Sequence, residues 1–73
     1  MIQRGKELIR INSSNKQKIE YSTDDGRNWK TRYSGSSYGD FYDLVDNGKE
    51  ILATTSKGLY YSTDDGRNWH KRS

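Results

Sequence analysis

Apolar side chains in this chain occur in short segments separated by glycine, asparagine and other polar residues. Segments of four to six residues rich in Ile, Leu, Tyr and Thr favour β-strands. No apolar set recurs at the i, i+3, i+4, i+7 spacing of an amphipathic helix. The Asn-Gly and Asp-Gly pairs, such as Asn47-Gly48 and Asp25-Gly26, are strong hairpin signals. The pattern therefore predicts an all-β fold of antiparallel meanders.

An internal repeat organises these segments. The nine residues from Tyr21 to Trp29 recur unchanged from Tyr61 to Trp69. Similarity extends backwards, where residues 5–9 align with residues 48–52, and forwards, where residues 30–32 align with residues 70–72. We therefore expect residues 1–73 to form a single domain of two blade-like meander units. The first unit is 1–34, which lacks most of its first strand, and the second is 40–73.

About seven short strands are expected in total. In the second unit they are 41–45, 50–55, 59–62 and 67–71, and the first unit repeats them with an opening strand reduced to 1–3 and a longer middle loop, 12–17. Residues 34–39 are expected to form a flexible connection. Ile19 and Tyr21 should share one face of their strand, as should Leu59 and Tyr61, and these faces should build the core.

The repeated turn has the order Ser-x-Asp-x-Gly-x-x-Trp. Its key positions are Ser22, Asp24, Gly26 and Trp29, and again Ser62, Asp64, Gly66 and Trp69. A hairpin loop of this length needs one residue with positive φ, which the glycine supplies. The aspartate can accept hydrogen bonds from loop N–H groups, and the serine can fix the entry of the loop. The tryptophan places a large ring under the hairpin, so we expect Trp29 and Trp69 to be buried anchors of the two units. Every member of the motif thus has a structural task.

This order closely resembles the Asp-box, also called the BNR repeat. The resemblance implies blades like those of β-propellers, as in sialidases, other glycoside hydrolases, sortilin-like receptors and photosystem assembly factors. In those proteins the boxes lie at blade turns away from the catalytic centre, so the resemblance implies an architecture and not an activity. A propeller needs about four to eight blades of four strands. This chain is too short for a closed monomeric propeller.

Two arrangements therefore remain open. The two sheets can pack on each other in a monomer, or several chains can assemble into a ring. Open sheet edges favour association, so the expected partner is a second copy of the chain or another protein.

Metal and cofactor sites are not predicted. The adjacent carboxylates Asp24-Asp25 and Asp64-Asp65 should point in different directions and lack the ligand spacing of a calcium loop. We expect Asp25 and Arg27, and likewise Asp65 and Arg67, to form solvated ion pairs. His70 is the only histidine, and no nucleophile lies in a recognisable elbow, so a Ser/His/Asp arrangement is not predicted. We expect His70 to be a solvent-facing strand residue.

Composition narrows the function classes further. The net charge of +3 comes from 13 basic and 10 acidic residues mixed along the chain, which indicates a solubilising surface and does not predict nucleic-acid binding. There is no Cys, no apolar run typical of a signal peptide and no stretch long enough to span a membrane. We expect a cytoplasmic protein, or a fragment of something larger.

These observations favour a non-enzymatic structural or interaction module. Tyr33, Tyr38, Phe41 and Tyr42 form an aromatic group around the connection that is more often core or interface than ligand platform. Stacking on a sugar ring stays open, so a carbohydrate-binding module is the first alternative. A fragment of a sialidase-like glycoside hydrolase is the second, although the arginine cluster and the Tyr, Glu and Asp roles which that resemblance requires cannot be placed here.

Overall fold

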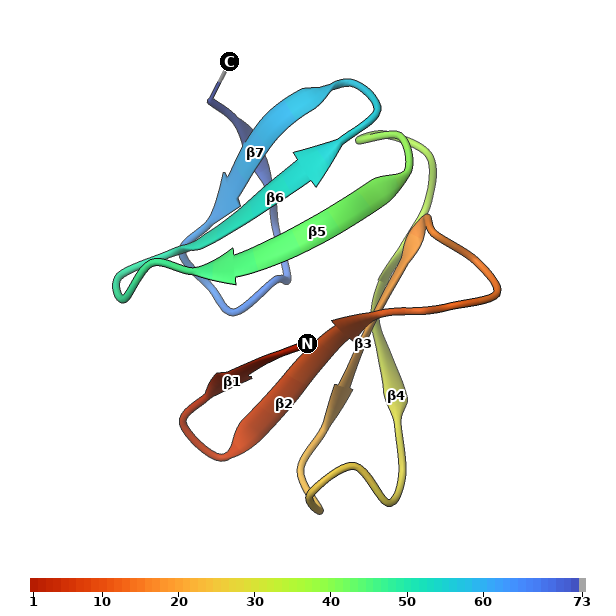
Figure 1. Ribbon diagram of the computed structural model, residues 1–73, viewed down its shortest axis with the longest axis vertical. Helices are drawn as coiled ribbons and strands as arrows, with labels where there is room; N and C mark the ends of the chain where they lie inside the picture. The colour runs from red at the N-terminus through yellow and green to blue at the C-terminus, as the bar shows by residue number, and fades with distance from the viewer. Residues whose placement is uncertain (73) are drawn as a thin grey trace.

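The first half of the chain forms one antiparallel meander. Its four strands are β1 (Ile2–Arg4), β2 (Glu7–Ile11), β3 (Lys18–Ser22) and β4 (Lys30–Ser34), paired in chain order. The computed structural model describes residues 1–72 and is shown in Figure 1. β1 has three residues, which agrees with the shortened opening strand expected for the first unit.

The second half forms another antiparallel meander. Its strands are β5 (Phe41–Asp46), β6 (Ile51–Thr55), β7 (Gly58–Ser62) and β8 (His70–Lys71), again paired in chain order. The expectation of an all-β fold with two meander units is confirmed. The described residues form eight strands rather than about seven, because the short β1 pairs fully with β2 through three residues. Ser73, the last residue of the predicted second unit, lies outside the described residues.

The last predicted strand, 67–71, begins later than expected. β8 starts at His70, because Arg67 and Asn68 still belong to the turn. The Arg67 N–H donates to the Asp64 carbonyl at 3.4 Å, and the Asn68 N–H donates to Asp64 Oδ1 at 2.9 Å. Backbone groups engaged in the turn are not available for a strand ladder.

Each sheet has two faces with different side chains, and we name them by the repeated residues. The motif face carries the serine of the repeat, as shown by the cross-strand pairs Leu8↔Ser22 and Ile51↔Ser62. The motif tryptophan lies on the same side, with Trp29 next to Leu8 at Gly26. The tyrosine face carries Tyr21 in the first sheet and Tyr61 in the second. Successive strand residues alternate between these faces.

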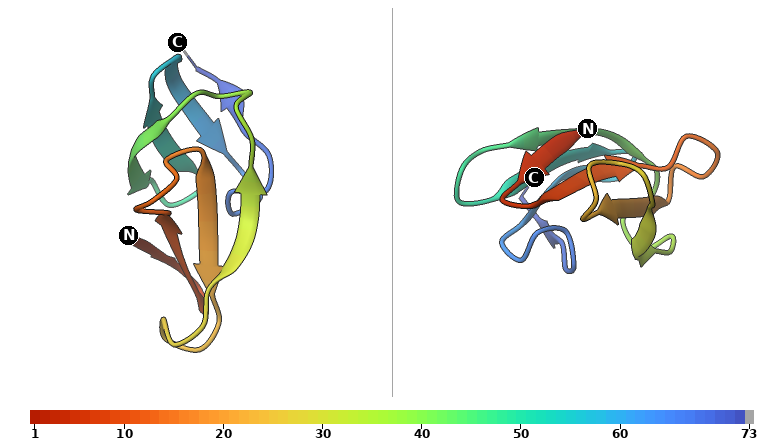
Figure 2. Two further views of the ribbon diagram at one scale, coloured as in Figure 1. Left: turned by 90° about the vertical axis from the view of Figure 1, so that its right-hand side faces the viewer. Right: turned by 90° about the horizontal axis from the view of Figure 1, so that it is seen from below.

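The core lies between the tyrosine face of the first sheet and the motif face of the second. Ile9 and Ile19 from the first sheet are 0% exposed, and they cluster with Ile51 and Trp69 from the second. The short strand β1 and strand β2 both contact β5, so neighbouring strands of the two sheets lie side by side (Figures 1 and 2). Only one of the two tyrosine faces is therefore buried. The expectation that both would build the core is wrong for the second sheet.

The connection between the sheets is tied to both of them. The Gly35 N–H donates to the Gln17 carbonyl and the Phe41 N–H donates to the Lys16 carbonyl. At Gly39 an added Cβ would lie 2.1 Å from Ser56 Oγ, so only glycine fits this close approach. These contacts fix the connection at both of its ends, and the flexibility expected for residues 34–39 stays a prediction.

Candidate functional site

The two motif turns have almost identical internal hydrogen bonds. In the first, the Ser22 hydroxyl donates to Asp24 Oδ1 at 2.7 Å and accepts the Gly26 N–H at 2.9 Å. Asp24 then accepts the Asn28 N–H at 2.8 Å and the Asn28 side-chain amide at 2.7 Å. The second turn repeats this network from Ser62 with distances that differ by no more than 0.1 Å. Asn28 was not singled out from the sequence, although its recurrence in the repeat was a usable signal.

The backbone of each turn contains two consecutive residues of positive φ where one was expected. Asp25 has φ 63° and Gly26 has φ 89°, and the second turn has nearly the same values at Asp65 and Gly66. The pair produces the tight reversal that aims the loop N–H groups at the aspartate. Aspartate tolerates this left-handed conformation better than most residues.

Hydrogen bonding lowers the pKa of the motif aspartates. The Ser22 hydroxyl, followed by the Asn28 backbone and side-chain amides, lowers the pKa of Asp24 to about 2. Burial opposes ionisation at Asp64, but the amides of Asn68 outweigh it and the pKa of Asp64 is also lowered. Hydrogen bonds to the charged form are the cause in both turns. These carboxylates are ionised and already bonded, so they are poor proton donors at neutral pH.

The two motif tryptophans have different surroundings. Trp69 is 3% exposed and its ring centroid lies 5.4 Å from that of Phe41 in the core. Trp29 is only partly buried, and the Arg10 guanidinium lies 3.8 Å above its ring. Trp29 Nε1 donates to the Gly26 carbonyl at 2.9 Å, whereas the buried Trp69 Nε1 has no partner among the described residues. The expectation that both are buried anchors holds for Trp69 and is wrong for Trp29, because no other sheet of residues 1–72 covers the first motif face.

A hollow lies beside Trp29. Its lining comes from the end of β3, the motif turn and the start of β4: Tyr21, Thr23, Asp24, Asn28, Trp29 and Lys30. Aromatic surface next to amide and carboxylate groups can accommodate a small polar molecule. The Asp24 and Asn28 side chains already bond to each other, which reduces what they can offer to a ligand.

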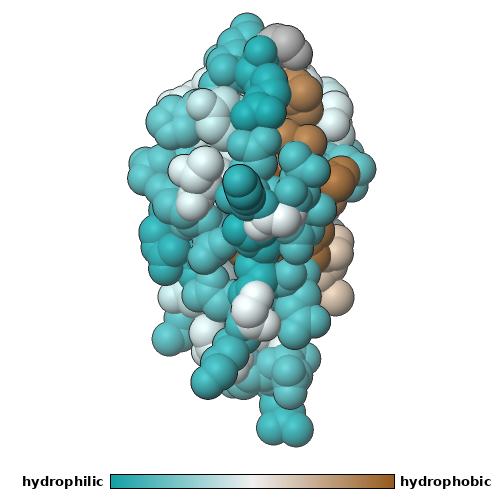
Figure 3. Space-filling view, turned by 90° about the vertical axis from the view of Figure 1, so that its left-hand side faces the viewer, coloured by the Kyte–Doolittle hydropathy of each residue, from teal (hydrophilic) through white to brown (hydrophobic). Residues whose placement is uncertain are grey.

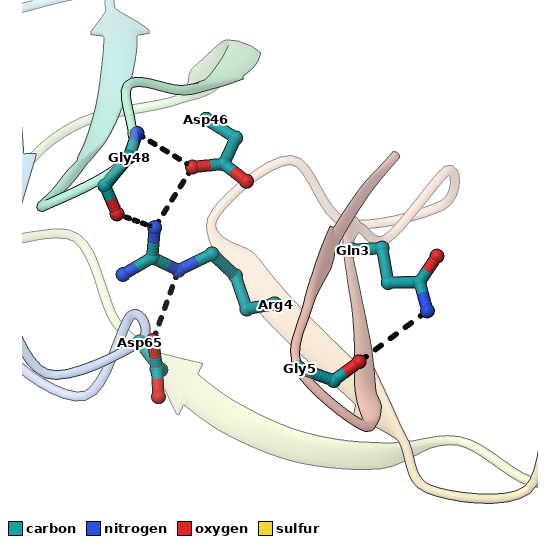
Figure 4. A pocket seen from close by; sticks show the side chains of 6 residues that line it. All are labelled: Gln3, Arg4, Gly5, Asp46, Gly48 and Asp65. Atoms are coloured by element: carbon teal, nitrogen blue, oxygen red, sulfur yellow. Dashed lines mark hydrogen bonds and ion pairs between the residues drawn. The ribbon is translucent and has the colours of Figure 1, made fainter.

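A second hollow lies where the two sheets meet, and Figure 4 shows its residues. Arg4 from β1 reaches across it, with Nη1 2.8 Å from Asp46 Oδ1 and Nε 3.1 Å from Asp65 Oδ1. Its guanidinium also donates to the Gly48 carbonyl. One cation thus joins the β5–β6 turn and the second motif turn to the first sheet. The expected ion pair of Asp65 with Arg67 is wrong, since Asp65 pairs with Arg4 and Arg67 donates to the Asp64 carbonyl.

Arg32 makes a second bridge between the sheets. A β-bulge between Ile19 and Glu20 leaves Arg32 opposite no single residue of β3, which re-aims its side chain. The guanidinium lies 3.9 Å above the Tyr21 ring and forms two bonds with Glu7, at 3.0 and 2.8 Å. Its Nη1 also donates to the Asp65 carbonyl at 2.9 Å. The Arg32 hydrogen bond lowers the pKa of Glu7.

Most of the predicted aromatic group lies between the sheets. The Tyr38 ring lies 5.1 Å from Tyr33, 6.3 Å from Phe41 and 5.0 Å from Tyr60. Phe41 is buried, whereas Tyr42 is 57% exposed. Three of the four residues therefore serve the contact between sheets, in line with the core or interface interpretation.

The remaining chemistry-bearing groups are dispersed. His70 is exposed on β8, as expected, with its ring 5.4 Å from that of Tyr61. Across residues 1–72, no cluster of three His, Asp or Glu side chains could hold a metal ion. In the same range no helix is long and apolar enough to cross a membrane.

Comparison with known proteins adds no further identification. A scan against protein-family models, a search of curated proteins and a search of solved structures each found no match.

Proposed function

We propose that this chain is a non-enzymatic interaction module built from two Asp-box units. The observation that carries the proposal is that both motif turns use their polar groups internally. Each motif serine and aspartate is bonded to atoms of its own turn. These residues shape the hairpins and leave the outer sheet faces as the surfaces that can bind.

The internal bridges support the same view. Arg32 has a side chain that is 4% exposed, and Glu7 and the Asp65 carbonyl take its donors. A group enclosed in this way joins two sheets and does not reach a substrate. The Asp-box resemblance adds an expected blade-like architecture, in which turns support the fold and faces make contacts.

Carbohydrate binding is the second candidate, and the hollow beside Trp29 favours it. The hollow joins the partly exposed Trp29 ring to polar groups of the same turn. Sugar recognition commonly combines an aromatic face with a few polar groups. No comparable feature of the described residues favours the third candidate, a fragment of a sialidase-like hydrolase.

Two assays on the whole chain separate these functions. A glycan array and a fluorogenic sialoside assay should give no binding and no turnover for an interaction module.

A stability test examines the structural role of the turn. Asp24→Ala should lower the melting temperature because the Ser22 and Asn28 partners lose their acceptor. Lys30→Ala, an exposed neighbour of the same turn, should leave it unchanged. Saturable binding of one glycan class that Trp29→Ala abolishes would replace the proposal with the carbohydrate reading.

A further inference from the structure

The two sheets pack head to tail, with unlike faces in contact. One face of each kind is therefore left uncovered, one at each end of the molecule. The tyrosine face of the first sheet lies against the motif face of the second. Each unit carries one face of each kind, because the units are repeats. The motif face of the first sheet and the tyrosine face of the second therefore have no partner sheet within residues 1–72.

Arg32 and Arg72 occupy equivalent positions and are held in the same pose. Arg32 lies 3.9 Å above Tyr21 and pairs with Glu7 at 2.8 Å, and Arg72 lies 4.2 Å above Tyr61 and pairs with Glu50 at 2.8 Å. They differ in their surroundings. Arg32 donates to a carbonyl of the second motif turn and its side chain is 4% exposed, whereas the Arg72 side chain is 43% exposed. Arg72 is thus posed for a motif turn that residues 1–72 do not supply.

The first motif turn lacks the cover that the second receives. At Gly66 an added Cβ would lie 3.8 Å from both Arg32 Cγ and Ile19 Cγ2, which belong to the first sheet. At Gly26 the three nearest atoms belong to Trp29 and Leu8, which are in the same unit. The partly exposed Trp29 shows the same difference from the buried Trp69.

The tyrosine face of the second sheet exposes apolar side chains. Val45 is 49% exposed, and Leu52 and Leu59 are partly exposed, whereas Ile9 and Ile19 at the equivalent positions are fully buried. Figure 3 shows a hydrophobic strip along one side of an otherwise polar surface, in the upper half that holds the second sheet. An apolar strip with a polar surround is typical of a protein interface.

We propose that the occupant of these two faces is a second copy of the chain. The tyrosine face of the second sheet would pack on the motif face of the first sheet of the next copy. Arg72 would donate to the Asp25 carbonyl of that copy, as Arg32 does to the Asp65 carbonyl. This inference rests on the proposed interaction function and names its partner. It uses the sheet faces, in place of the sheet edges that the sequence suggested.

Such a contact joins unlike surfaces, so it repeats from copy to copy, and it forms a ring when the rotation between copies closes, as the blades of a propeller do. Each copy would bring two blade-like units, and propellers close with about four to eight blades, so the ring would hold two, three or four copies. The outer motif face carries Arg10 and Glu20 where the inner one carries Ala53 and Tyr60. This more polar surface makes the contact between copies weaker than the internal one. The assembly should therefore dissociate on dilution.

Analytical ultracentrifugation and native mass spectrometry of the whole chain test the proposal. The expected result is a discrete species of two, three or four times the 8.5 kDa chain mass that dissociates on dilution. Arg72→Ala should weaken association about tenfold or more. Lys16→Ala, the matched control with the same charge change at an exposed loop position, should not change it.

A mixing experiment tests the head-to-tail geometry. Arg72→Ala impairs one face and Trp29→Ala impairs the other. At a concentration where the wild type assembles and each variant alone is monomeric, the mixture should form a dimer through the two intact faces. Leu8→Lys is a second variant of the motif face, at a position equivalent to the fully buried Ile51. Circular dichroism confirms that each variant is folded.

Three results would overturn the ring. They are a wild-type protein that stays monomeric at millimolar concentration, an oligomer that neither face variant weakens, and open-ended polymers in place of a discrete species. None of these results touches the proposed function, which fails instead if the chain hydrolyses a sialoside or binds a glycan.

Discussion

Replacing Trp69 by Ala should unfold the protein. Trp69 is 3% exposed and packs against Phe41 in the core between the sheets. Truncating a buried tryptophan costs about 3–5 kcal/mol through lost burial and the cavity left behind. A domain of this size has a net stability of about 3–5 kcal/mol, so the loss consumes most or all of it.

The same substitution at Trp29 should be tolerated, although the two motifs are identical in sequence. Trp29 is partly exposed at the open motif face, and its ring contacts include the Arg10 guanidinium at 3.8 Å, on a side chain that is itself 41% exposed. Losing this partial burial and the cation–π contact should cost about 1–2 kcal/mol. Urea unfolding followed by far-UV circular dichroism, at concentrations where the chain is monomeric, measures both variants.

Trp69→Phe serves as the control for this comparison. It keeps an aromatic ring next to Phe41 and removes an indole N–H that has no hydrogen-bond partner among residues 1–72. This variant should remain folded with a modest loss of stability. Equal losses of stability for Trp29→Ala and Trp69→Ala would refute the assignment of one covered and one open motif face.

Three further outcomes are expected. Stability should fall as the pH drops from about 4 to 2. The pKa of Asp24 is about 2 in the folded protein and 3.8 ordinarily, so the ionised carboxylate contributes its full stability above pH 3.8. This contribution is lost as the pH falls through the folded pKa. Thermal melts across this range would show it, and an Asp24→Asn variant should have a shallower slope. Asp65→Asn should cost up to about 1 kcal/mol and Asp25→Asn less, because only Asp65 binds Arg4; equal costs in urea melts would contradict the bridge. Calcium should leave the melting temperature unchanged, since hydrogen bonds occupy Asp24 and Asp64, and a saturable rise of several degrees would show a site.

The local structure of the turns followed from the sequence. The Ser-x-Asp-x-Gly-x-x-Trp order indicated a hairpin whose aspartate accepts loop N–H groups, and both turns have this arrangement. Such predictions succeed because partners two to four residues apart meet through backbone geometry alone. The bulge that re-aims Arg32 and the second positive φ, at Asp25, were not predicted from the sequence. The residues around the bulge nevertheless carried a signal, because Arg32, Glu7 and Tyr21 all recur in the repeat.

The sequence by itself determined the all-β class, the two meander units and the internal design of each turn. These depend on short-range periodicity and on contacts within a few residues. Only the tertiary structure decided which faces are buried, and so why Trp69 lies in the core while Trp29 is partly exposed. The physical reason is that one interface between two sheets can cover only one face of each. Identical sequences therefore acquire different burial from their position in the stack.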